Sequence, residues 1–183
     1  MRVSREQVAE NRREILKVAG RMFRERGVEA VTVAEVMQAA GLTHGGFYGY
    51  FKSKDDLVAQ AIAGALASAP PLDDLAAYMA TYLSPAHRDD RARGCAVAAL
   101  AAETVRAPGE ARTEMTAGLR AQIENLSRKM PGADEAERRR TAIGSWAAMV
   151  GALILARVSD DEALSGEVLD ETRAWLEGRL ATA

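Results

Sequence analysis

Cysteine, histidine and aromatic residues are scarce in this sequence. A single cysteine, Cys95, cannot form an internal disulfide, so the composition excludes a disulfide scaffold and leaves a reducing cytoplasm as the expected location. The two histidines and the cysteine show neither a His-x-x-x-His nor a Cys-x-x-Cys spacing, so we expect no metal site. A Gly-rich phosphate loop is also missing. We therefore expect no cofactor and no catalytic residues.

Long hydrophobic runs are missing as well. The longest stretch without charge covers residues 141–156, which are 16 residues between Arg140 and Arg157. Crossing a bilayer takes about 20 apolar residues, so this stretch predicts a helix buried in protein and no membrane partner. The first residues are charged and lack the apolar segment of a signal peptide, so we expect no export.

Charge is nearly balanced overall but unevenly distributed. The 24 basic and 26 acidic residues give a formal charge of −2, which alone would argue against a nucleic-acid partner. Residues 1–57, however, hold ten bases against eight acids and carry +2, whereas the remainder, with 14 bases and 18 acids, carries −4. The N-terminal segment therefore has the sign of charge that nucleic-acid binding requires.

Alanine, the residue with the highest helix propensity, is abundant, and the pattern predicts an all-α chain. Ser4 and Gln7 have the spacing of a capping box at the start of the first helix, which Gly27 ends. Thr32 and Glu35 repeat that spacing at the second helix. About nine helices are expected, near residues 5–26, 32–40, 43–50, 53–69, 72–83, 94–106, 110–129, 134–158 and 161–180, with Pro70 and Pro71 closing the fourth.

Two of these segments are short and are separated by a tight turn. Residues 32–40 and 43–50 are joined at Gly41 and Leu42, and a longer helix precedes them, which is the layout of a helix-turn-helix. In that motif the second short helix fits the major groove of DNA, while the first lies across the backbone. Three glycines in the second segment cost about 1 kcal/mol each relative to alanine, and we interpret them as allowing close approach to DNA.

A more specific pattern overlaps this motif: Gly-x-Tyr-x-x-Phe-x-x-Lys, from Gly46 to Lys54, follows Ala-Gly-Leu. With it the chain resembles the TetR family of bacterial transcriptional regulators. The residues that carry the resemblance are Gly27, Thr32, Val33, Leu57 and the segments 39–43 and 46–54. The resemblance implies a helix-turn-helix domain over residues 1–52 and a helical ligand-binding and dimerisation domain over residues 53–183. It also implies a homodimeric repressor that a small-molecule inducer releases from a palindromic double-stranded operator.

The same resemblance assigns DNA-binding roles to individual residues. Contacts to phosphates are expected from Thr32, Tyr48, Tyr50, Lys52 and Lys54, and contacts to bases from Thr43, His44, Gly45 and Gly49. Each has a simpler reading: the threonines as helix caps, the tyrosines as surface residues and the histidine as an exposed side chain without a partner. Phe47 and Phe51 are expected in the core.

The C-terminal helices suggest two further sites. One face of the last two helices is apolar, and a two-fold four-helix bundle would cover it, so we expect a dimer interface at Ile143, Ala147, Val150, Ile154, Val168 and Trp175. The middle helices could enclose a ligand pocket near Tyr78, Tyr82, Cys95, Glu103, Met115, Leu119 and Trp146. In either case some of these residues could be ordinary core.

Three alternatives stay open at this point. Cys95 follows Arg93 and Gly94 near a predicted helix start, where a lowered pKa would suit a regulator that senses oxidants or electrophiles through its thiol. A helical interaction module would bind no DNA at all. An enzyme using His87, Cys95 and Glu103 is disfavoured, because these residues lie in different segments without a catalytic motif.

Overall fold

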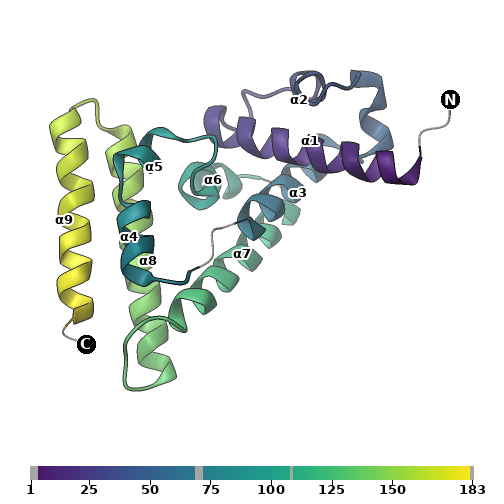
Figure 1. Ribbon diagram of the computed structural model, residues 1–183. Helices are drawn as coiled ribbons and strands as arrows, with labels where there is room; N and C mark the ends of the chain where they lie inside the picture. Colours follow the sequence, from purple (N-terminus) through teal and green to yellow (C-terminus); the bar gives the residue numbers. More distant parts are fainter. Residues whose placement is uncertain (1–3, 69–71, 108, 182–183) are drawn as a thin grey trace. The chain divides into compact units, whose positions relative to one another are not determined.

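The computed structural model describes residues 4–68, 72–107 and 109–181, and within these ranges it contains helices and no strand (Figure 1). The predicted all-α class is confirmed. Arg5–Arg26 forms α1, Val33–Ala39 α2, His44–Gly49 the 3-10 helix η1, and Lys54–Ala67 α3. The remaining helices are α4 (Leu75–Tyr82), α5 (Pro85–Asp89), α6 (Ala96–Thr104), α7 (Gly109–Ser127), α8 (Glu135–Val158) and α9 (Glu162–Ala181). The predicted break at Pro70 and Pro71 lies outside the described residues.

The helix ends show which capping signals were correct. Thr32 and Glu35 form a complete capping box, in which the Thr32 hydroxyl accepts from the Glu35 amide and the Glu35 carboxylate accepts from the Thr32 amide. Gly27 ends α1 with a φ of 86°, a conformation that glycine adopts without steric cost. The box at Ser4 is only half formed. Ser4 accepts from the amide of Gln7, but the Gln7 side chain donates to another residue of α1.

Two segments differ from the predicted helices. Residues 44–49 form a 3-10 helix instead of an α-helix, and the Thr43 side chain makes no capping hydrogen bond to it. Three glycines in a short segment make regular α-helix costly, which accounts for this difference. A short helix that was not among those predicted, α5, begins at Pro85. Proline is well tolerated as the first helical residue, and Ser84 caps the turn by accepting from the His87 amide.

The helices form two compact units, which we describe separately. The first comprises Met1–Ala69 together with Cys95–Gly118. In it α1 packs against α2, α3 and α6, and η1 packs against α2. The largest fully buried side chains of this unit are Ile15, Phe23, Met37, Phe47, Leu57, Ile62 and Leu100. These residues come from α1, α2, η1, α3 and α6, so a single apolar core holds the helix-turn-helix in place.

This grouping divides the chain differently from the predicted boundary after residue 52. Leu57, Val58 and Ile62 of α3 are buried in the core of the first unit, where α3 packs mainly against α1. A helix from much further along the chain, α6, completes the same core. The division at residue 52 stays a prediction about function, whereas the packing groups α3 and α6 with the helix-turn-helix.

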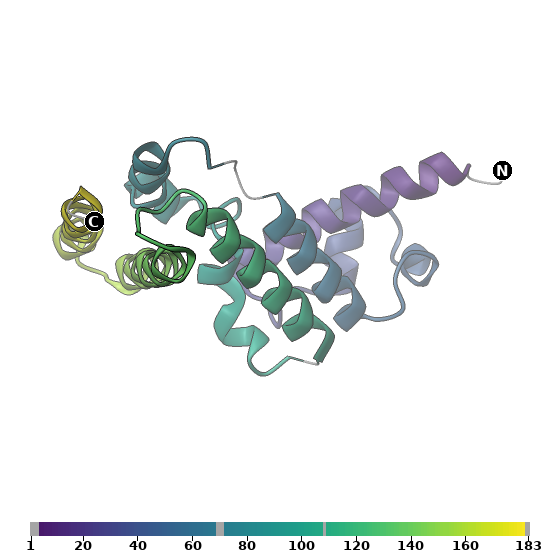
Figure 2. The same cartoon turned by 90° about the horizontal axis from the view of Figure 1, so that it is seen from below.

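The second unit comprises Pro70–Gly94 and Leu119–Ala183. Its long helices α8 and α9 lie side by side, as Figures 1 and 2 show. Near the end of α8, the Arg157 guanidinium donates to the carbonyls of His87 (2.9 Å) and Arg88 (3.0 Å) in α5, which satisfies carbonyls that a helix end leaves without partners. In the described part of the chain, α8 is also the one helix long and apolar enough to cross a bilayer, a test that buried helices of soluble proteins pass too.

The packing around Arg157 gives a prediction for Gly94. A Cβ atom on this residue would lie 2.7 Å from Nη2 of Arg157 and 2.9 Å from the carbonyl oxygen of Asp90. Gly94→Ala should therefore lower the free energy of unfolding by about 1–3 kcal/mol, because backbone and guanidinium must both shift. Gly64→Ala in α3 is the matched control, since no atom lies within 4 Å of its added methyl group. Urea denaturation checks both variants, and an unchanged Gly94→Ala protein would contradict the packing.

Candidate nucleic-acid interface

The segment proposed to read DNA is held by two phenylalanines. Phe47 and Phe51 are 1% and 2% exposed and stack with ring centroids 5.7 Å apart. Their burial confirms them as core residues. The residues before Phe47 and between the two phenylalanines are largely exposed to solvent. Tyr48 is 76% exposed, and Thr43, His44, Gly45 and Gly49 are also exposed. The buried rings thus fix η1 while its other face stays free for a partner.

The glycines of this segment are not required by the packing of the protein itself. A Cβ atom at Gly45 or Gly49 would meet no atom within 4 Å, and at neither position is φ in the left-handed region. Gly46 differs, because a Cβ there would touch Met37, Thr43 and Tyr50 at 3.9 Å, an ordinary contact distance. Packing within the chain therefore leaves room for a side chain at 45 and 49, so the close approach expected at these two positions would be to a partner.

Thr32, Lys52 and Lys54 lie at the starts of the helices that precede and follow this segment in the chain. Thr32 is the N-cap of α2 and is exposed, and its hydroxyl donates to the Glu35 carboxylate at 2.8 Å. Lys52 is exposed, and Lys54, half-buried, is the first residue of α3. A cation near a helix N-terminus is unfavourable by itself, so an anion bound at this position would stabilise it.

Two chains of hydrogen bonds join α1 to this face, and neither was predicted. In one, the Asn11 amide donates to the hydroxyl of Tyr50 at 2.9 Å. In the other, Arg12 donates to Gln60, Gln60 donates to Asp56, and Asp56 accepts from the backbone amide of Lys52 at 2.8 Å. The first bond of each chain joins residues that are far apart in the sequence: Asn11 and Tyr50 are 39 positions apart, and Arg12 and Gln60 are 48. No local spacing could have revealed these bonds.

The capping carboxylate of α2 is strongly perturbed. The backbone amide and hydroxyl of Thr32 and the guanidinium of Arg26, 2.7 Å away, all donate to Glu35, and together they lower its pKa from 4.5 to about 2. Both the amide and the hydroxyl proton of Thr32 donate to Glu35, so the hydroxyl would have to leave Glu35 before it could donate to a phosphate. The phosphate contact expected from Thr32 stays a prediction.

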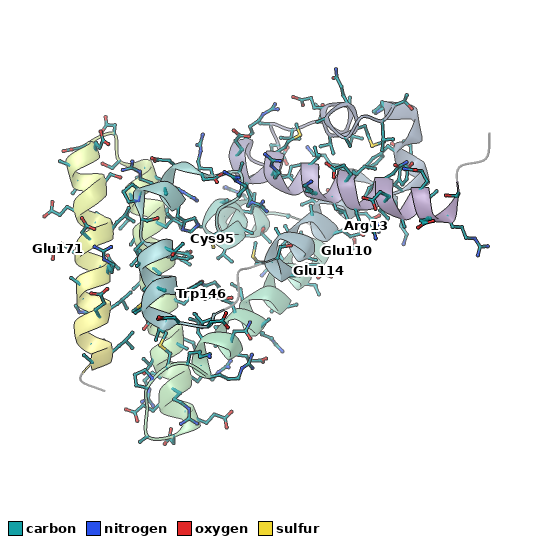
Figure 3. The ribbon with its side chains drawn as sticks, in the orientation of Figure 1. Arg13, Cys95, Glu110, Glu114, Trp146 and Glu171 are labelled. Carbon is teal, nitrogen blue, oxygen red and sulfur yellow. The ribbon has the colours of Figure 1, made fainter. Side chains whose placement is uncertain are left out.

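The seven residues of the expected ligand pocket are distributed over both units. Cys95, Glu103 and Met115 belong to the first unit, and Tyr78, Tyr82, Leu119 and Trp146 belong to the second. Figure 3 labels Cys95 at the start of α6 and Trp146 on α8. Met115, Tyr82 and Trp146 are buried, and the hydroxyl of Tyr78 accepts from the Gln122 amide at 3.0 Å. Their shared role in a pocket remains a prediction, as does the reactivity of Cys95, which is half-buried.

Glu103 has a defined partner within the first unit. Its carboxylate accepts from the backbone amide of Val28 at 2.8 Å and would lie 3.0 Å from a Cβ atom on Gly27. Glycine at position 27 thus serves both the positive φ and the close approach of this side chain. The bond ties α6 directly to the turn that leads from α1 into the helix-turn-helix.

The expected dimer residues lie at the surface of the second unit. On α8, Ile143, Ala147 and Ile154 are exposed and Val150 is half-buried. On α9, Trp175 is 55% exposed. Val168 is half-buried, and Leu164 and Val158 extend the exposed apolar surface at the ends of α9 and α8 that face the turn between them. The interface itself stays a prediction.

Helices pack around one core, and residues 43–50, which we call the reading segment, are largely exposed. Hydroxyl and lysine groups lie near this segment in the chain. These features define a protein of the helix-turn-helix class. Two family profiles match the chain. "Bacterial regulatory proteins, tetR family" matches residues 15–61, and "Transcriptional regulator LmrA/YxaF-like, C-terminal domain" matches residues 71–166, more than half of the chain. The chain therefore belongs to the TetR family of bacterial regulatory proteins, as its residues had indicated.

Among curated relatives, the HTH-type transcriptional regulator AcrR of Shigella flexneri is 39% identical over 59 residues, which are 32% of this chain and 27% of AcrR. The HTH-type transcriptional repressor KstR2 of Mycobacterium tuberculosis is 40% identical over 60 residues, 33% of this chain and 30% of KstR2. The match thus spans less than a third of these relatives, a length that suits the DNA-binding part alone.

Solved structures match over nearly the whole chain. A TetR-family transcriptional regulator from Agrobacterium tumefaciens gives a TM-score of 0.73 at 21% identity, covering 93% of this chain and 97% of that one. The reduced form of NemR from E. coli gives 0.69 at 20% identity, covering 92% and 96%. At such identities the likeness supports the fold of both units.

The perturbed carboxylate leads to a pH-dependent prediction. Because folding lowers the pKa of Glu35, its contribution to stability is present above pH 4.5 and is lost as the pH falls toward 2. Glu35→Gln should lower the free energy of unfolding at neutral pH, and its difference from the wild type should shrink over that interval. Urea denaturation at a series of pH values measures this, with Glu25→Gln, exposed near the end of α1, as the control. A pH-independent difference would contradict the assignment.

Proposed function

We propose that this chain is a cytoplasmic, ligand-responsive transcriptional repressor that binds a palindromic double-stranded operator as a homodimer. The single observation that supports it most is the exposed face of residues 43–50, anchored from behind by Phe47 and Phe51. Thr32, Lys52 and Lys54 precede and follow that segment in the chain. No enzymatic activity is proposed, and the relatives named above are transcriptional regulators.

In this proposal the contacts divide into positioning and reading. Thr32, Tyr48, Tyr50, Lys52 and Lys54 bind phosphates and fix the register of the protein on the duplex. Thr43 and His44 face base edges, and Gly45 and Gly49 let the backbone approach the groove. Among these residues His44 alone has a long side chain that can form hydrogen bonds to bases. The preference for one DNA sequence would therefore depend partly on the shape of the DNA.

The homodimer is supported by the exposed apolar residues of α8 and α9. Ile143, Ile154 and Trp175 would be covered by the same surface of a second copy, since a two-fold axis makes such a patch self-complementary. Binding to two successive turns of the major groove would require the residues 43–50 of the two copies to lie about 34 Å apart, and a two-fold dimer on such a site predicts a palindromic operator.

Release by an inducer follows from linkage. A small molecule that binds better to a conformation unfit for DNA lowers the affinity for the operator, and DNA lowers the affinity for that molecule by the same factor. The inducer site is proposed within one of two groups of expected ligand residues: Cys95, Glu103 and Met115 of the first unit, or Tyr78, Tyr82, Leu119 and Trp146 of the second. The carboxylate of Glu103 links such a change to the helix-turn-helix through Val28.

Lys54 provides the direct test of phosphate binding. The wild-type protein should select a palindromic duplex from random DNA, and Lys54→Ala should weaken binding to that duplex and flatten its salt dependence by about one unit of slope. Lys129→Ala, which removes an exposed lysine of the second unit, is the matched control and should leave the slope unchanged. If the wild-type protein selects no duplex, the proposed function is wrong.

The dimer is tested at Ile154. Ile154→Glu should convert the dimer to a monomer and weaken operator binding by more than about tenfold, because a charge in an apolar interface is left without a partner. Analytical ultracentrifugation measures the oligomeric state. Ala136→Glu adds the same charge at an exposed position in the first turn of α8 and should keep the dimer. A dimeric Ile154→Glu protein would place the interface elsewhere.

A further inference from the structure

The two tyrosines of the reading segment differ in how firmly they are held. Tyr48 is 76% exposed, and its ring meets only the edge of Phe47 among the ring contacts described. Tyr50 is half-buried, its Cε2 atom packs over Gly46, and its hydroxyl accepts a hydrogen bond from Asn11. Tyr50 is therefore fixed at the ring and at the hydroxyl, whereas Tyr48 is not.

Asn11 belongs to a chain of hydrogen bonds that runs in one direction. The side-chain amide of Gln7 donates to the carbonyl oxygen of Asn11 at 2.9 Å, and the amide of Asn11 donates to the hydroxyl oxygen of Tyr50 at 2.9 Å. A phenol hydroxyl can accept and donate at the same time. Because its oxygen already accepts from Asn11, its own proton remains available for another acceptor.

We propose that Asn11 is a positioning residue for DNA binding, acting through Tyr50; this inference rests on the proposed function. Asn11 holds the phenol oxygen from the side of α1, so the hydroxyl proton points to a phosphate oxygen and the side chain is ordered before DNA arrives. A contact ordered in advance costs less conformational entropy on binding. Tyr50 is thus the stronger phosphate ligand of the two tyrosines.

The helical position of Asn11 argues against a purely structural role. Asparagine is a poorer helix former than alanine, and Asn11 lies in the interior of α1. Its hydrogen bond to Tyr50 offsets that cost only in part, since both groups are partly exposed to water. Asn11→Ala should therefore fold, and an effect on DNA binding would not arise from unfolding.

A double-mutant cycle tests the proposal on a duplex selected by the wild-type protein. Tyr50→Phe removes the hydroxyl and should weaken binding about five- to tenfold, because a hydrogen bond to a charged phosphate is lost. Asn11→Ala should weaken binding about three- to fivefold in the wild-type background. In the Tyr50→Phe background it should change binding less than about 1.5-fold, because the group it positions is gone. Neither variant should change the salt slope, since no charge is removed.

The second unit offers a matched control for the loss of an asparagine amide. Asn125 is exposed on α7, and its side-chain carbonyl accepts from Arg128. Asn125→Ala should leave operator affinity unchanged in both backgrounds. Proton NMR of the DNA-free protein supplies a readout that does not depend on DNA, because Tyr50→Phe should shift the side-chain amide resonances of Asn11.

The results that would contradict the inference can be told apart from one another. If the wild-type protein selects no duplex, the proposed function and this inference are both wrong. If the wild type binds and Asn11→Ala binds as tightly or more tightly, the phenol donates to Asn11 instead, and only this inference is wrong. Equal weakening by Asn11→Ala in both backgrounds would show that Asn11 acts independently of Tyr50, which also overturns it.

Discussion

The burial of Phe47 and Phe51 is the constraint on which the reading segment depends. A six-residue 3-10 helix with three glycines has little stability of its own. The two rings, nearly inaccessible to water, contribute roughly 2–3 kcal/mol each toward holding it against the core. Because the two buried rings are four residues apart, anchoring them leaves His44, Gly45 and Tyr48 exposed. The packing of these two rings in the core thus determines which residues of the segment are exposed at the surface.

Charge contributes less to this surface than the sequence suggests. Arg13 and Lys17 of α1 pair with Glu10 and Glu14 one turn earlier, and Arg26 pairs with Glu35. Much of the positive charge of the N-terminal segment is therefore balanced within the segment itself. A modest field of this kind suits a protein that fixes its register through oriented hydroxyls and amides as well as through lysines.

Local signals in the sequence predicted most helices, but not the contacts between distant segments. The capping box at Thr32 and the end of α1 at Gly27 depend on neighbouring residues, so their spacing was sufficient. The 3-10 geometry of η1 was missed because caps and glycines do not by themselves distinguish helix types. The bonds from Asn11 to Tyr50 and from Glu103 to Val28 join residues 39 and 75 positions apart, and only tertiary packing brings them together.

The bond between Glu103 and Val28 has a consequence for regulation. It joins α6, a helix more than 70 residues away in sequence, to the turn between α1 and α2, within a single compact core. Packed cores do not deform continuously, so a displacement of α6 must either carry this turn along or break the bond. Breaking it would leave the partly buried Glu103 carboxylate and Val28 amide without their hydrogen bond, which costs about 1–3 kcal/mol. That range is also the coupling free energy typical of allosteric proteins, so under the proposed function this contact would link a shift of α6 on inducer binding to the affinity for DNA.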